Sequence, residues 1–102
     1  MGIEKKYFKN KPVCKATFTL CKEAAGDATS VYVVGDFNNW DSLATPMKKQ
    51  KSGAFKATVD IETGREHQYR FLVDGTRWVN DWNADKYVPS PFGDCENCVV
   101  VA

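Results

Sequence analysis

The stretch Ser30-Val31-Tyr32-Val33-Val34-Gly35-Asp36-Phe37-Asn38-Asn39-Trp40-Asp41 decides how this chain folds. Its first five residues are β-branched, aromatic or small, a composition that favours a strand. Gly35 ends the strand in a turn, and we expect Phe37 to anchor that turn from below. The polar residues that follow place Trp40 at the surface. The stretch therefore predicts a core strand that leads into an exposed tryptophan.

Apolar and polar residues alternate along 13–22, 55–61 and 67–73, which predicts half-buried strands there. Further strands are expected at 77–79, as the return of a hairpin, and at 99–101. Asp74-Gly75 is a strong two-residue hairpin signal. Residues 80–94 are predicted to be irregular, and we find no helical periodicity of useful length. Short strands separated by turns predict an all-β fold, an antiparallel β-sandwich, with a small barrel as the alternative.

The length of 102 residues suits one modest core. We divide the chain into a flexible polar arm, residues 1–12, and a single β-sandwich domain, residues 13–102. The 14 basic and 13 acidic residues leave a net charge of +1, which gives no electrostatic footprint for a nucleic acid or a membrane partner. The sequence shows no signal peptide and no stretch that could span a bilayer, so we expect a cytoplasmic protein.

Four cysteines admit several interpretations: Cys14, Cys21, Cys95 and Cys98. The last two have the spacing of half a zinc site. However, extended chain would separate the first two by roughly 23 Å and turn them to opposite faces. Four reduced thiols are the interpretation that we favour, and a metal site is the one that we favour least. A disulfide from Cys14 or Cys21 to the last pair stays open, and we predict no cofactor.

Catalysis finds little support in the sequence. His67 is the only histidine, and the strand period turns it the same way as Tyr69 and Phe71, as expected of a hydrogen-bonded core or edge residue. We see no nucleophile motif and no glycine-rich phosphate loop. The aspartates lie in turns, where they commonly cap the backbone, although a paired-carboxylate site stays open. We predict that the chain is not an enzyme.

The tryptophans carry a sharper signal. A flat apolar ring beside hydrogen-bonding groups suits a sugar, whose C–H face stacks on the ring while its hydroxyls need polar partners. We expect Trp40 and Trp78 to be exposed and Trp82 to plug one end of the core. Gln68 and Arg70 point away from the core face of their strand, so they can line such a surface.

These residues also carry a resemblance. Val31-Tyr-Val-Val-Gly-Asp-Phe-Asn-Asn-Trp40, followed by His67-Gln-Tyr-Arg-Phe-Leu-Val-Asp-Gly75 and a tryptophan at 78, is similar to the family 48 carbohydrate-binding modules. That family includes the glycogen-binding domain of AMP-activated protein kinase β-subunits. It also includes the early-set domains that precede the catalytic barrel of isoamylases and glycogen branching enzymes. The likeness covers residues 30–101.

The resemblance implies an immunoglobulin-like sandwich of the early-set type that binds α-1,4-linked glucans such as glycogen or starch. The stacking tryptophans of the family fall on Trp40 and Trp78, and its basic residue, usually lysine, falls on Arg70. The family's apolar residue before a glycine matches Phe92. The family's sugar-binding asparagine in the same late loop falls on Glu96 or Asn97, and Asn97 is the better match because it retains the amide. We add Gln68 as a further contributor.

The resulting hypothesis is a stand-alone, non-catalytic module whose partner is an α-glucan, since no catalytic barrel follows in the chain. The alternative is an interaction module that uses the same surface for a protein, such as a glycogen-metabolising enzyme, because exposed tryptophan and arginine are also enriched in protein interfaces. An enzyme fragment is the third class, and it would require glucan turnover or a barrel encoded nearby.

Overall fold

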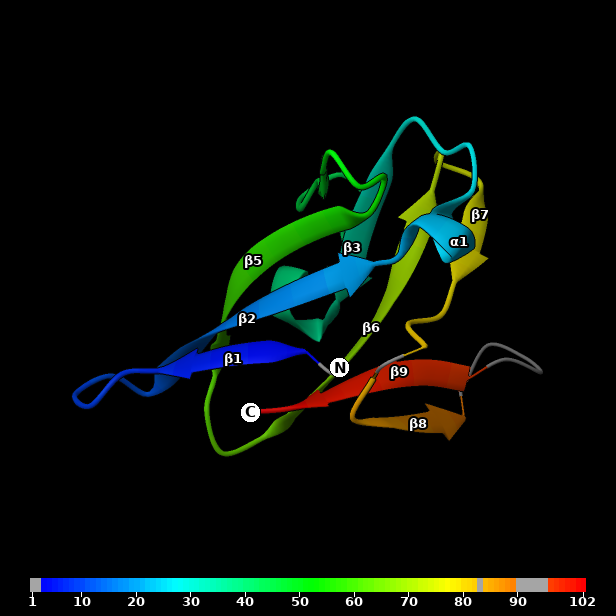
Figure 1. The fold of residues 1–102 in the computed structure, drawn as a ribbon. Coiled ribbons are helices and arrows are strands. Elements are labelled where there is room, and N and C mark those ends of the chain that lie inside the picture. Colours follow the sequence, from blue (N-terminus) through cyan, green and yellow to red (C-terminus); the bar gives the residue numbers. More distant parts are fainter. Residues whose placement is uncertain (1–2, 83, 90–95) are drawn as a thin grey trace.

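A computed structural model describes residues 3–82, 84–89 and 96–102, which form two antiparallel sheets packed face to face (Figure 1). Within these residues the first sheet has the order β1-β2-β5-β4: β1 (Glu4–Tyr7), β2 (Val13–Leu20), β5 (Phe55–Glu62) and β4 (Lys48–Lys49). The second has the order β3-β6-β9-β8: β3 (Val31–Gly35), β6 (Glu66–Val73), β9 (Glu96–Val101) and β8 (Lys86–Pro89). Strand β7 (Arg77–Val79) also pairs with β6. The predicted all-β, immunoglobulin-like sandwich is confirmed.

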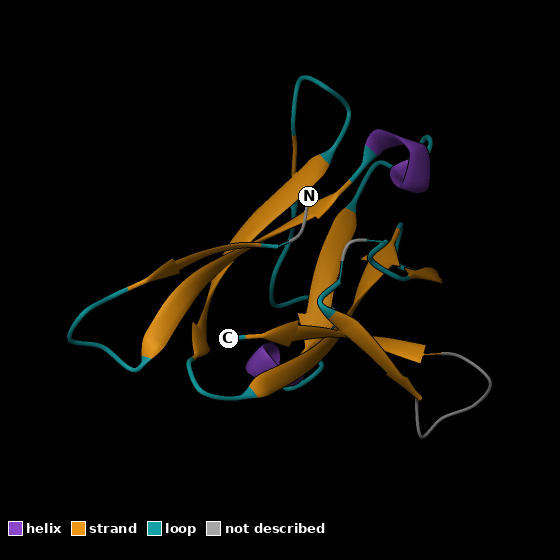
Figure 2. Ribbon diagram, turned by 60° about the horizontal axis from the view of Figure 1, so that its bottom comes forward, coloured by secondary structure: helices purple, strands orange, loops and turns teal. Residues whose placement is uncertain are grey.

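Helix contributes little to the described chain (Figure 2). It consists of one turn of α-helix, α1 (Lys22–Ala25), and a 3-10 turn, η1 (Asp36–Asn38). Neither is long and apolar enough to cross a membrane. The first turn lies in a segment that we had expected to be loop, directly after β2, which ends at Leu20 rather than at residue 22.

The core lies between the sheets and is built by the alternating apolar residues of β2, β3, β5 and β6. The ring of Phe18 in β2 packs against Tyr69 in β6, with 4.7 Å between the ring centroids. Phe18 also stacks on Phe37 of η1, at 5.4 Å. Phe37 therefore anchors the turn after β3 from below, as predicted.

Gly35 allows β3 to approach β6 closely. It pairs with Tyr69 in the register of the two strands, and its φ of −169° is ordinary extended backbone. A Cβ atom at this position would lie 2.4 Å from the carbonyl oxygen of Gln68 and 2.8 Å from the Cβ of Tyr69. Only a residue without a side chain fits here, because real Cβ atoms essentially never approach other atoms so closely.

Two edge strands were missed by the sequence analysis. Strand β8 lies in the segment 80–94, so the prediction that this whole segment is irregular was wrong. Strand β1 lies within the predicted polar arm, where Glu4 pairs with Thr17 and Tyr7 with Cys14. Edge strands are often short and charged, which hides the apolar alternation that marks a strand. The division into arm and domain stays a prediction.

Asp74 holds the hairpin between β6 and β7 against the loop before β3. Its Oδ1 accepts hydrogen bonds from the backbone N–H groups of Thr29 and Ser30, at 2.8 and 3.0 Å, and from the Thr29 hydroxyl at 3.0 Å. These bonds favour the ionised carboxylate and lower the pKa of Asp74. Its φ of 52° is left-handed, a conformation that aspartate and asparagine tolerate better than most residues.

We predict that Gly35→Ala destabilises the fold by about 3 kcal/mol, because the added methyl group meets the backbone of β6 rather than a movable side chain. Urea denaturation measures the loss. Gly64→Ala is the control, since its φ is +78° but nothing lies within 4 Å of the added atom, and it should cost only about 1 kcal/mol. Equal losses for the two variants would show that the approach at Gly35 is not tight.

We predict that Asp74→Asn lowers stability at neutral pH and that this difference shrinks in acid. The substitution keeps the side-chain oxygen and the tolerance of left-handed backbone but removes the charge. Because the folded-state pKa of Asp74 lies below the ordinary value of 3.8, the charge stabilises the fold fully above that pH. The contribution is lost as the pH falls through the folded-state pKa. Urea titrations between pH 7 and pH 2 measure it, and a constant difference would refute the assignment.

Candidate functional site

The outward face of the second sheet carries most of the residues predicted to bind sugar. The strand register places Arg70 opposite Val34, and Leu72 opposite Trp78, so these side chains share one face. Gln68 lies on the same face of β6, two residues from Arg70. The apolar side chains of this face, Val34, Leu72 and Val99, are buried. They form an apolar floor beneath the polar and aromatic residues.

Arg70 lies where the partner of β6 changes. On the edge of β6 that faces away from β3, β7 pairs with Phe71–Val73 and β9 pairs with Glu66–Tyr69. At this seam the Nε of Arg70 donates to Oδ1 of Asn80 at 2.9 Å. The guanidinium carbon lies 5.8 Å from the centre of the Trp78 ring, within range of a cation–π contact. Arg70 and Trp78, which is 44% exposed, therefore form one unit.

Gln68 and Asn97 form a second unit on this face. The Nδ2 of Asn97 donates to Oε1 of Gln68 at 3.0 Å, and Asn97 is only 5% exposed. Asn97 was expected in the loop before the final strand, but it lies within β9, which begins at Glu96. In this arrangement Asn97 mainly orients the side chain of Gln68.

Trp40 lies just beyond η1 and is 39% exposed, as predicted. Its indole Nε1 donates to Oδ1 of Asp36 at 3.0 Å. The other carboxylate oxygen, Oδ2, accepts the backbone N–H of Gln68 at 2.9 Å. The loop is fixed further by the backbone N–H of Trp40, which donates to the carbonyl of Gly35 at 2.9 Å. Trp40 is thus tied to the same strand that carries Arg70.

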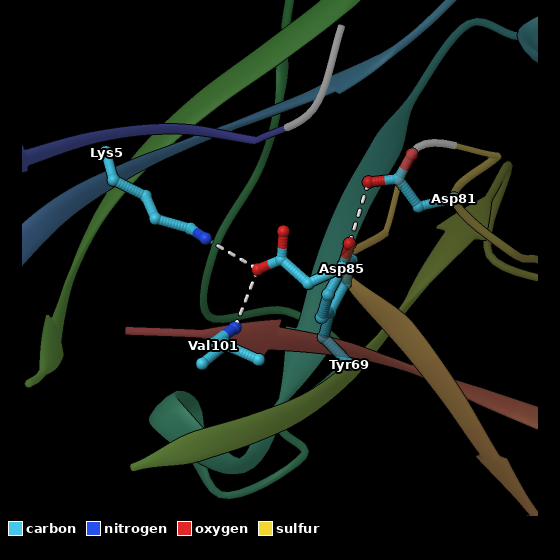
Figure 3. A network of polar contacts seen from close by, with 5 residues as sticks. All are labelled: Lys5, Tyr69, Asp81, Asp85 and Val101. Carbon is cyan, nitrogen blue, oxygen red and sulfur yellow. Dashed lines mark hydrogen bonds and ion pairs between the residues drawn. The ribbon is translucent and has the colours of Figure 1, made fainter. Parts of the chain in front are cut away.

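Trp82 does not plug the core, contrary to our prediction, and is 63% exposed. Its neighbour Asp81 occupies the interior instead and is 3% exposed. The hydroxyl of Tyr69 donates to Oδ2 of Asp81 at 2.7 Å (Figure 3). Burial, and then the negative charge of Asp81, raise the pKa of Tyr69, so its hydroxyl stays a donor. A buried tyrosine hydroxyl needs a partner, and the chain supplies it by turning Asp81 inward and Trp82 outward.

Sequence reasoning missed the roles of two residues at this site. Asp36 was considered only among the aspartates of turns, and no role was assigned to Asn80. The spacing of four residues between Asp36 and Trp40 could have suggested a local bond, but the bond to Gln68 crosses 32 positions. Phe92, the remaining predicted residue, lies outside the described residues.

His67 is a buried core residue, as predicted. Its Nε2 lies 2.9 Å from the carbonyl oxygen of Glu62 and must donate, because a carbonyl can only accept. The ring packs edge-on against Phe37 at 6.4 Å. With 3% of its surface exposed, the imidazole has no access to a substrate.

The described cysteines, Cys14, Cys21 and Cys98, carry free thiols, while Cys95 lies outside the described residues. Cys98 is buried, and its sulfur accepts the backbone N–H of Asp81 at 3.1 Å. Burial raises the pKa of Cys98 to about 11, and it also raises the pKa of Cys14. In the described ranges no three histidine, cysteine, aspartate or glutamate side chains gather as a metal site would require.

An immunoglobulin-like sandwich with tryptophan, arginine and amide side chains on one exposed sheet face belongs to the class of small β-sandwich binding modules. Comparison with protein families refines this class. Residues 23–102 match the glycogen recognition site of AMP-activated protein kinase, and the chain belongs to this family of carbohydrate-binding modules. The predicted family resemblance is therefore confirmed.

Similar proteins point the same way. The chain is 40% identical to 5'-AMP-activated protein kinase subunit beta-1 of Sus scrofa over 76 residues. These residues make up 74% of this chain and 57% of that relative. It is 37% identical over 91 residues to subunit beta-2 of Homo sapiens, covering 89% of this chain and 31% of the relative. Subunit beta-1 of Mus musculus is 38% identical over 76 residues, 26% of its length. The chain thus spans between about a quarter and just over half of these relatives.

We predict that thiol labelling separates the described cysteines by burial. At pH 8 roughly one Cys98 thiol in a thousand is ionised, because its pKa is about 11, and the thiolate is the reactive form. Half-exposed Cys21 should react within minutes with an alkylating reagent, whereas Cys14 and Cys98 should react only in urea. Peptide mass spectrometry identifies the labelled sites. Rapid labelling of Cys98 in the native chain would contradict its burial.

Proposed function

We propose that this chain is a non-catalytic module that binds an α-1,4-linked glucan, of the glycogen or starch type, on the outward face of the second sheet. The observation that carries the proposal is the Arg70–Trp78 unit, an exposed ring in cation–π contact with a guanidinium over an apolar floor. Membership of a family described as a glycogen recognition site supports it.

The chemistry of a glucan fits this face. Each glucose ring offers a C–H surface to an aromatic ring and hydroxyls to hydrogen-bonding groups. Trp40 and Trp78 would supply the two stacking platforms, one from the loop after β3 and one from β7. Arg70 and Gln68, both on the outward side of β6, would bond the hydroxyls. Arginine presents a planar fork of donors, unlike the point charge of the lysine that is usual in the family.

The two other predicted residues, Asn97 and Phe92, have a different standing. Asn97 is nearly covered, so we propose that it acts chiefly by holding the amide of Gln68 in place. A role for Phe92 stays a prediction. We expect weak affinity, because an exposed face buries little of the ligand and must order a flexible chain. The 102-residue chain by itself should bind, without an attached catalytic domain.

The absence of enzymatic activity and the cytoplasmic location belong to this proposal as well. The only histidine is buried and already hydrogen-bonded, which supports a binding role over acid–base catalysis. A protein partner is the alternative use of the same face, and it gains some support from the relatives, which are named as subunits of a kinase. Competition with excess glucan separates the two uses.

We predict that the chain binds maltoheptaose with a dissociation constant in the micromolar to millimolar range and is retained on glycogen. Trp40→Ala and Trp78→Ala should each lower the affinity at least tenfold, because each removes a stacking surface. Isothermal titration, with electrophoresis through a glycogen gel, measures both. Trp82→Ala is the matched control, because Trp82 is the most exposed tryptophan and is not one of the two proposed stacking residues.

Three results would count against the proposal. The first is no binding by the intact chain at millimolar maltoheptaose. The second is equal loss from all three tryptophan variants. The third is capture of a specific protein partner whose binding depends on Trp40 and Trp78 but does not respond to excess glucan, which would favour the alternative. Release of shorter sugars from glycogen by the purified chain would refute the non-catalytic assignment.

A further inference from the structure

The carboxylate of Asp36 joins two parts of the candidate site. Its Oδ1 accepts the indole N–H of Trp40 at 3.0 Å, and its Oδ2 accepts the backbone N–H of Gln68 at 2.9 Å. The first bond reaches four residues along the loop, and the second crosses to the central strand β6. Both oxygens are therefore engaged, and hydrogen bonds to an ionised group are stronger than those between neutral groups.

The backbone that carries Trp40 is unusual. Asn39 and Trp40 both have a φ of 57°, and left-handed backbone is strained for a bulky side chain. Asn38 stabilises the backbone of this loop. Its Oδ1 accepts from the N–H of Gly35, and its Nδ2 donates to the carbonyl of Val33 and the hydroxyl of Thr45, each at 3.0 Å.

Asn38 and Asp36 thus have different roles in the loop. Asn38 fixes the path of the loop, but it does not determine how the indole ring turns about its side-chain bonds. Asp36 contacts the ring itself and connects it to β6 at Gln68, whose side chain bonds Asn97 and which lies two residues from Arg70. The ring of Trp40 is thereby placed in a defined position relative to the polar residues of the face.

We propose that Asp36 is a positioning residue of the site, which holds the Trp40 ring in its sugar-stacking orientation before the ligand arrives. This inference rests on the proposed glucan binding and deepens it. A ring that is ordered in the free protein loses less conformational freedom on binding, and the affinity rises accordingly. Asp36 acts through Trp40 and does not itself need to contact the sugar.

The test uses Asp36→Asn, which keeps the size of the side chain but replaces one acceptor oxygen with a donor. One of the two N–H groups then faces another donor, so the bridge cannot form as before. We expect the affinity for maltoheptaose to fall about threefold to tenfold, as expected for one newly mobile aromatic side chain. In the ligand-free chain, the indole N–H signal of Trp40 should shift and exchange faster with solvent, as seen by ¹⁵N NMR.

Asp41→Asn is the matched control. Asp41 lies in the same loop and accepts the backbone N–H of Leu43 at 2.9 Å, so it supports the turn beyond Trp40 and not its ring. This variant should bind like the wild type and leave the indole signal in place. Urea denaturation of each variant verifies that the fold survives at the temperature of the titration.

Trp40→Phe separates positioning from direct contact. Phenylalanine retains a stacking ring but has no N–H to donate to Asp36. If Asp36 acts through the indole, adding Asp36→Asn to Trp40→Phe should change the affinity less than twofold. Loss of the same size in both backgrounds, with an unchanged indole signal in the free chain, would overturn the proposal and make Asp36 a direct contact.

The two hypotheses can fail separately. If the wild type does not bind maltoheptaose, the proposed function is wrong, yet the NMR comparison in the free chain still tests whether Asp36 orders the ring. If the wild type binds and Asp36→Asn leaves both the affinity and the indole signal unchanged, glucan binding stands and the positioning role is refuted.

Discussion

Strand β3 can lie against β6 at its end only because residue 35 lacks a side chain. The close approach lets Tyr69, opposite Gly35, fill the core against Phe18. The same glycine donates its N–H to Asn38 and accepts the N–H of Trp40, so it also begins the loop that carries the exposed ring. The packing of the interior and the position of the loop therefore depend on one contact. A shift there would affect both at once.

Features with a local signal in the sequence were predicted correctly. The alternation along β6 correctly separated Tyr69 and Phe71, inside, from Gln68 and Arg70, outside. A tryptophan that follows polar turn residues was correctly expected to be exposed at position 40. Such predictions need only the strand period and the chemistry of turns.

Features that depend on contacts between distant parts of the chain were predicted wrongly or missed. Trp82 was placed in the core because large apolar side chains usually lie there, but the hydroxyl of Tyr69 required a buried acceptor and Asp81 took the interior position. The bond from Asp36 to Gln68 depends on the pairing of two strands and has no signature in either segment alone. The short edge strands, the charged β1 and the four-residue β8, show no apolar period that could reveal them.

Asp85 contacts both the first and the last strand of the described chain (Figure 3). Its carboxylate accepts from the Lys5 ammonium at 2.6 Å and from the backbone N–H of Val101 at 2.7 Å, so the first and last strands meet at one side chain. The side chain of Asp85 therefore links the two ends of the described fold. A linker could join these two ends, and the chain could be opened instead at the Ser52–Gly53 turn, where Ser52 is exposed. The order of the strands along the chain could then change while the aromatic face stayed as it is.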